Sequence, residues 1–93
     1  MTIFNDGIMQ ADIIQKGWVF LTWINNEVGH LPVSLVKDLK RVEAIIKSER
    51  LKGWVCNSEK DHPQMHKILK RVGAQVYDED NEVFFFKKEI SHV

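Results

Sequence analysis

Four side chains near the middle of the chain are of types that bind metal ions or transfer protons: Cys56, Asp61, His62 and His66. A helix that begins near residue 61 places the two histidines one turn apart on one face, where their imidazoles could chelate zinc beside a thiolate. Cys56 is the only cysteine, however, and its apolar surroundings predict a buried strand. Nothing in the sequence orients an imidazole to make this thiol a nucleophile. We therefore expect packing and surface roles here, with no metal site and no catalytic residue.

Three consecutive phenylalanines, at positions 84–86, lie near the C-terminus. Because successive residues of a strand point to opposite faces, their rings cannot all enter one core. We expect some exposure here, and predict Phe84 and Phe86 as contacts for a partner protein. An acidic hairpin tip just before them is predicted as a second contact, because a compact negative protrusion can engage a basic surface. The tip comprises Asp78, Glu79 and Asp80.

Tryptophans and basic residues have a structural interpretation that is simpler than a functional one. The tryptophans lie in apolar segments, which favours core packing over an aromatic platform for a ligand; they are Trp18, Trp23 and Trp54. The basic residues fall on two predicted helices, where a solvated outer face is favoured over a nucleic-acid stripe; they are Lys37, Lys40, Arg41, Lys67, Lys70 and Arg71.

Composition excludes several classes of protein. The 93 residues contain 13 Lys and Arg against 13 Asp and Glu, so the formal net charge is zero and the basic surface of a dedicated nucleic-acid binder is missing. A single cysteine permits no intrachain disulfide. The longest apolar run is far shorter than the roughly 20 residues that span a bilayer. We expect a cytoplasmic protein that binds neither membranes nor nucleic acid.

Turn residues and hydrophobic spacing divide the chain into alternating strands and helices. Strands are predicted at 2–4, 18–24, 53–56, 74–77 and 82–88, with 8–15 either a strand or a short helix and 57–60 a polar loop. Helices are predicted at 34–50, capped by Ser34, and from Asp61 to the terminating Gly73. We expect one α/β (α+β) domain over residues 1–93 with a mixed sheet, in which 1–16 form a strand or an arm.

From residue 17 to residue 88 the chain resembles the C-terminal half of the GNAT N-acetyltransferase fold, including small phage-borne GNAT-like proteins. The resemblance rests on Trp54-Val55-Cys56-Asn57, on the helix through Met65, Ile68 and Leu69, and on Val72-Gly73-Ala74 before a hairpin. It implies a mixed, mostly antiparallel sheet with two main helices.

The same resemblance implies where acetyl-CoA would bind, at Trp23, Ile24, Gly29 and Asn57. Residues 26–31 align with the family's Gln/Arg-x-x-Gly-x-Gly/Ala pyrophosphate loop, but Glu27 adds a negative charge, Leu31 replaces a small residue and Pro32 lacks an amide donor. The family's usual general acid, a tyrosine, aligns with Leu69, which cannot transfer a proton.

The sequence therefore favours a small non-catalytic module that binds a protein partner, with no cofactor. A phage origin, a host protein as the partner and a homodimer that completes the half-sheet are further expectations. The alternative is a minimal acetyl-CoA-dependent N-acetyltransferase.

Overall fold

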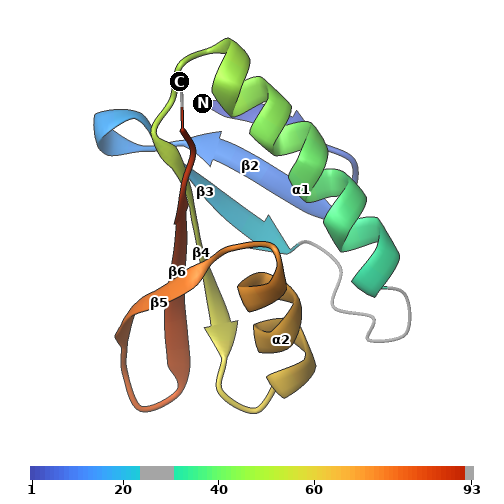
Figure 1. Ribbon diagram of the computed structural model, residues 1–93, viewed down its shortest axis with the longest axis vertical. Coiled ribbons are helices and arrows are strands. Elements are labelled where there is room, and N and C mark those ends of the chain that lie inside the picture. The colour runs from blue at the N-terminus through green and yellow to red at the C-terminus, as the bar shows by residue number, and fades with distance from the viewer. Residues whose placement is uncertain (24–30, 92–93) are drawn as a thin grey trace.

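The computed structural model describes residues 1–23 and 31–91, with side chains described as far as Trp23 and again from Leu35 onward. In these residues six strands form one sheet and two helices pack against it (Figure 1). The elements are β1 (Thr2–Asn5), β2 (Met9–Ile13), a 3-10 turn (Gln15–Gly17), β3 (Trp18–Trp23), α1 (Leu31–Ser48), β4 (Gly53–Glu59), α2 (Pro63–Arg71), β5 (Gln75–Glu79) and β6 (Val83–Glu89). Neither described helix combines the length and the apolar character needed to cross a membrane.

The strands have the order β1-β2-β3-β4-β6-β5. Of the paired neighbours in the described sheet, β3 and β4 run parallel, whereas the others run antiparallel. The units β3–α1–β4 and β4–α2–β5 both connect parallel strands and both proceed in the same direction across the sheet. Because such crossovers are right-handed, both helices lie on one face. This confirms the predicted mixed, mostly antiparallel sheet with two helices.

A single hydrophobic core fills the space between this face and the helices. The predicted apolar stripe of α1 is confirmed, because each of its residues is at most 2% exposed; the stripe comprises Leu35, Leu39, Val42 and Ile46. From the strands the core receives Met9, Ala11, Val19, Leu21, Trp54, Cys56 and Phe86, and from α2 it receives Leu69.

Glu43 of α1 ties the helix to two strands. Its Oε2 accepts a hydrogen bond of 3.0 Å from Nε1 of the fully buried Trp54, and both of its carboxylate oxygens lie 3.0 Å from Nζ of Lys88. The carboxylate therefore satisfies the one polar atom of the buried indole and fixes α1 over β4 and β6.

Helix boundaries differ from those predicted at both N-termini. The helix α1 begins at Leu31, so Ser34 lies inside its first turn and is not the cap. Pro32 falls in that first turn, where its missing N–H leaves no intrahelical bond unmade. The N-cap of α2 is His62, not Asp61, and it makes no side-chain capping bond.

Strand boundaries show where tertiary pairing outweighs local composition. The polar segment predicted as a loop from residue 57 continues β4 to Glu59, because Asn57, Ser58 and Glu59 pair with Phe85, Phe84 and Val83 of β6. The segment 8–15 is resolved as strand β2 followed by the 3-10 turn. Gly73 ends α2 with φ +99°, a left-handed conformation that glycine adopts freely, which confirms its predicted role.

Candidate functional site

A cleft opens where the two parallel strands diverge. The register of β3 and β4 runs from Trp18↔Gly53 to Leu21↔Cys56, and the described residues form no further pair beyond that point. Figure 1 shows the two strands separating toward the end of β3, with α2 beside the gap. The cleft has a volume of about 660 Å³, within the range of about 300–1,000 Å³ that is typical of small-molecule sites.

The lining of the cleft comes from strands β3, β4 and β6, from α2 and from the turn that precedes α2, and it combines apolar with polar groups. It consists of Phe20, Leu21, Thr22, Trp23, Asn57, Ser58, Glu59, Asp61, His62, Pro63, Gln64, Met65, Ile68 and Val83. The strands β3 and β4 provide the walls, and the start of α2 closes one end. A ligand here would lie against apolar side chains. It would also lie against the backbone of β3 and β4 beyond Leu21 and Cys56, where the described residues of the two strands no longer pair.

Trp23 supplies an unsatisfied donor to this lining. The ring lies partly buried against the core, yet its Nε1 is buried and has no hydrogen-bond partner among the described residues. A buried donor without an acceptor costs about 1–3 kcal/mol, so an acceptor brought by a ligand would relieve that cost.

A histidine and two carboxylates gather at the mouth of the cleft. His62 Nε2 lies 3.3 Å from Glu59 Oε2 and 3.6 Å from Asp61 Oδ1, and one ligand atom from each residue falls within 4.8 Å of the others. All three side chains are exposed. Solvent therefore competes for each group, and nothing buried preorganises the cluster to hold an ion.

The four residues singled out at first do not converge on one site. Cys56 is 1% exposed, and burial raises the pKa of its thiol to about 12. His66 Nε2 lies 2.9 Å from the carbonyl oxygen of Glu59, and its ring packs edge-on against Phe84. The Nε2 atoms of the two histidines therefore have different neighbours, carboxylates for His62 and a backbone carbonyl for His66.

The residues predicted for acetyl-CoA fall partly on this cleft. Trp23 and Asn57 line it, whereas Ile24 and Gly29, like the rest of the expected pyrophosphate loop up to residue 30, lie outside the described residues. Sequence reasoning missed Thr22, Ser58 and Met65, and the signal for them is the end of the shared register, which one sequence does not reveal.

Leu69, at the position of the family's acid, is buried with 0% exposure in the core and does not line the cleft. Its neighbours Met65 and Ile68 reach the cleft instead. The helix thus provides an apolar wall where proton transfer would need a hydroxyl or an imidazole.

The phenylalanines near the expected partner surface differ in how far they are exposed. Phe86 is 0% exposed, which corrects the expectation of an exposed ring at this position: it faces the helices, where its ring lies 5.6 Å from that of His66. Phe84, on the same face, is half-buried, with Lys60 Nζ 5.1 Å from its ring centre. Phe85 points to the other face and contacts the exposed ring of Tyr77.

The acidic tip is exposed, but part of the predicted turn belongs to strand β5. Asp78 and Glu79 belong to β5, where a bulge pairs them with Phe85 and Phe84. Glu79 is bridged to Lys60 at 2.7 Å. In the turn, Asp80 accepts hydrogen bonds from the backbone N–H groups of Glu82 and Val83, which lower the pKa of its carboxyl.

The predicted core packing of the tryptophans is confirmed in part. Trp54 is fully buried, as predicted, and Trp23 packs partly buried against the core. Trp18 is half-buried and lies at the start of β3, beside Gly53 of β4. The three rings therefore do not form one exposed platform.

Comparison with known proteins identifies the fold. No protein-family model and no curated protein matches the sequence. Among solved structures, the chain is similar to a GNAT-family acetyltransferase from Listeria monocytogenes, with a TM-score of 0.70 and 10% identity over 88% of this chain and 56% of that one. It is also similar to the N-acetyltransferase PseH of Campylobacter jejuni, with a TM-score of 0.65 and 15% identity over 89% of this chain and 58% of that one. The chain spans less than two thirds of either protein.

Proposed function

On this GNAT-like fold, we propose that the domain binds the pantetheine arm of an acyl-CoA in the cleft between β3 and β4, without turning the thioester over. The observation that carries the proposal is the divergence of the two parallel strands after Leu21↔Cys56, which opens a cleft of about 660 Å³ in the middle of the sheet.

The chemistry of the cleft suits an extended ligand that carries amides. Strands that separate leave backbone N–H and C=O groups facing the gap, and an extended amide chain can pair with them as an added strand does. On its other side β4 stays paired with β6 as far as Glu59, so this edge is rigid. Pantetheine is such a chain, because it is linear and contains two amide groups.

Trp23 provides a specific contact for this ligand. Its Nε1 donor has no acceptor among the described residues, and a pantetheine carbonyl would provide one. Asn57, on the facing strand, is exposed at the cleft and offers a side-chain amide. Met65 and Ile68 of α2 would cover the methylene groups.

The groups around the cleft support the proposal of binding without turnover. A leaving thiolate needs a proton donor, and the side chain at the family's acid position is the buried Leu69. The titratable imidazole in the lining is His62, which lies exposed at the mouth between Glu59 and Asp61.

Calorimetric titration with acetyl-CoA and with CoA tests the proposal. We expect saturable binding that is lost in Thr22→Trp, because Thr22 is an exposed cleft residue and the indole would fill the gap. Lys70→Trp is the matched control, since Lys70 is exposed on α2 and does not line the cleft. Absence of heat with both ligands at millimolar concentration would refute the proposal.

A thiol-release assay with acetyl-CoA and a panel of amine acceptors then separates binding from catalysis. We expect no release above the uncatalysed rate. Release that disappears in His62→Gln would instead establish the alternative, an N-acetyltransferase in which the exposed imidazole moves the proton.

A second candidate function is protein binding at the β5–β6 hairpin. The edge strand β5 has all five residues exposed, with Val76 40% and Tyr77 50% exposed, and an exposed edge can accept a strand from another protein. A host protein as partner and a phage origin belong to this candidate. Its test is capture of one defined protein that is lost in Tyr77→Asp and kept in Lys70→Asp.

A further inference from the structure

One row of side chains crosses all six strands on the face opposite the helices. Directly opposite residues of neighbouring strands share a face, so the register fixes the members of the row. From β1 to β5 in sheet order they are Thr2, Asp12, Phe20, Val55, Lys87 and Gln75.

This row points away from the core. Residues next to its members along the strands are buried toward the helices, as Val19, Leu21, Trp54 and Phe86 show with at most 1% exposure. Both described helices pack on the opposite face, which carries the core. There Glu43 of α1 accepts hydrogen bonds from Lys88 of β6. No described helix covers the face that carries the row.

The row is polar at both ends and apolar in the middle, with opposite charges at its two sides. Asp12 lies on β2, Lys87 lies on β6, and Phe20 and Val55 stand between them, both half-buried. The Asp12 carboxylate is held by hydrogen bonds from Thr2 and Gln10, so its position on the face is fixed.

We propose that a second copy of this chain packs on this face, with a two-fold axis parallel to the strands. That axis reverses the direction of the row, so Asp12 of each copy faces Lys87 of the other and Phe20 of each faces Val55 of the other. The surface is therefore self-complementary, as a two-fold interface requires, and each contact occurs twice.

Other properties of the chain favour a second copy as the partner on this face. The formal net charge is zero, so two copies do not repel each other at long range. Beside the row, Tyr77 is 50% exposed and contacts Phe85 with ring centres 6.3 Å apart, which widens the apolar surface. Two sheets that pack face to face lie about 10 Å apart, which leaves room for these side chains to interdigitate.

Charge exchange tests the geometry directly. Sedimentation equilibrium of the full chain over a concentration series should give a mass that rises toward twice 10.9 kDa. Asp12→Lys and Lys87→Glu should each weaken the dimer at least about tenfold, and the double variant D12K/K87E should restore it, because each copy supplies both ends of the row. Lys70→Glu, which changes net charge as Lys87→Glu does but lies on α2, should have no effect.

Far-UV circular dichroism of each variant checks that the fold is kept. Should Asp12→Lys fail to fold, Val55→Lys replaces it, because a charge placed opposite Phe20 of the other copy should also dissociate the dimer. A monomer at every concentration would overturn the proposal. Equal weakening by Lys87→Glu and Lys70→Glu, or a double variant no better than the single ones, would also overturn it.

Discussion

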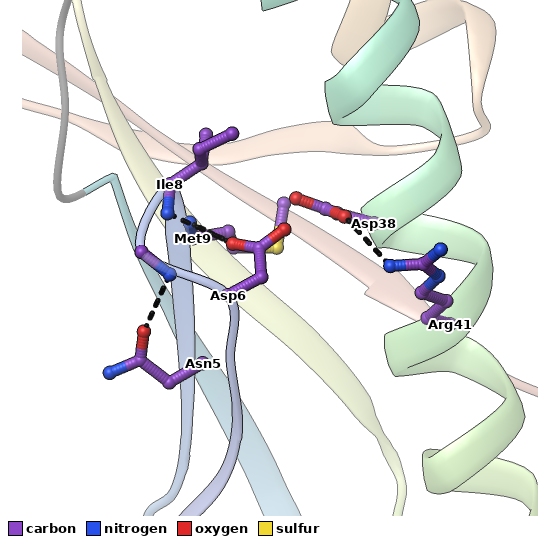
Figure 2. A network of polar contacts seen from close by, with 7 residues as sticks. Asn5, Asp6, Ile8, Met9, Asp38 and Arg41 are labelled. Atoms are coloured by element: carbon purple, nitrogen blue, oxygen red, sulfur yellow. Dashed lines mark hydrogen bonds and ion pairs between the residues drawn. The ribbon is translucent and has the colours of Figure 1, made fainter.

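The carboxyl group of Asp38, on α1, faces that of Asp6, in the turn between β1 and β2 (Figure 2). Asp38 is only 4% exposed and its Oδ2 has no donor among the described side chains, whereas Asp6 Oδ1 accepts backbone hydrogen bonds of 2.9 Å from both Ile8 and Met9. Burial and the neighbouring Asp6 raise the pKa of Asp38 to about 6, against the opposing charge of Arg41. Burial acts to raise the pKa of Asp6, but hydrogen bonds with Asp38 and the backbone outweigh it and lower that pKa. The pair therefore shares one proton in mildly acidic solution.

This pair predicts a specific dependence of stability on pH. Between the ordinary Asp pKa of 3.8 and about 6, folded Asp38 keeps a proton that the unfolded chain has released, so its contribution falls as pH rises and is lost above about 6. Asp38→Asn replaces the shared proton with an amide donor. It should raise the free energy of unfolding at neutral pH by about 1–2 kcal/mol and change it little near pH 4.

Urea denaturation at both pH values measures this effect. Asp61→Asn, at an exposed position in the turn before α2, is the control and should change neither value. An equal effect of Asp38→Asn at the two pH values would show that Asp38 does not hold the proton.

Glu43 should contribute more to the free energy of unfolding than an ordinary surface carboxylate does. Glu43→Ala leaves the indole N–H of buried Trp54 without its acceptor and Lys88 without its ion pair, so we expect a loss of about 2–3 kcal/mol in the free energy of unfolding. Glu43→Gln keeps an oxygen for Trp54 and should lose less. Lys47→Ala, exposed on the same helix, should change stability by no more than about 0.5 kcal/mol. Equal losses for the Ala and Gln variants would contradict the assigned hydrogen bond.

At Gly53 the backbone of β4 leaves no room for a side chain beside β6. A Cβ at this position would lie 2.1 Å from the carbonyl oxygen of Lys88 and 3.0 Å from Cα of Glu89, and backbone atoms of a paired strand cannot move aside cheaply. We expect Gly53→Ala to cost about 3 kcal/mol or more. Gly7→Ala should cost only about 1 kcal/mol, because that turn glycine has φ +85° but no atom near the added methyl group. Thermal unfolding that ranks the two variants equally would argue against this register.

Cys56 should be inert in the folded protein. It is 1% exposed, and burial raises the pKa of its thiol to about 12, so almost no thiolate is present at neutral pH. A disulfide reagent should modify the native chain only as fast as it unfolds, and should react at once in urea. Rapid stoichiometric reaction under native conditions would place this thiol on the surface instead.

The sequence predicted elements whose signals are local. The spacing of Leu35, Leu39, Val42 and Ile46 predicted the buried face of α1, and Gly73 predicted the end of α2. Pairing between distant strands was harder to predict from the sequence. The residues from Asn57 to Glu59 are polar, yet they form part of a strand because they pair with β6.

The site depends on long-range relationships of this kind. The cleft exists because β3 and β4 stop pairing after Leu21 and Cys56, and no residue type marks that point. The burial of Phe86 likewise depends on which face of β6 the helices cover, which alternation alone leaves undecided.

The most direct measurement is a nitrogen–proton correlation spectrum of the labelled protein, recorded while CoA is added. The indole N–H of Trp23 lies in a cleft residue and serves as the reporter, and that of Trp54, which is bonded to Glu43, serves as the internal control. We expect the Trp23 indole signal and the amides of Thr22 and Asn57 to shift together and saturate, while the Trp54 indole stays in place. A spectrum unchanged by CoA, or shifts confined to the β5–β6 hairpin, would contradict ligand binding between β3 and β4.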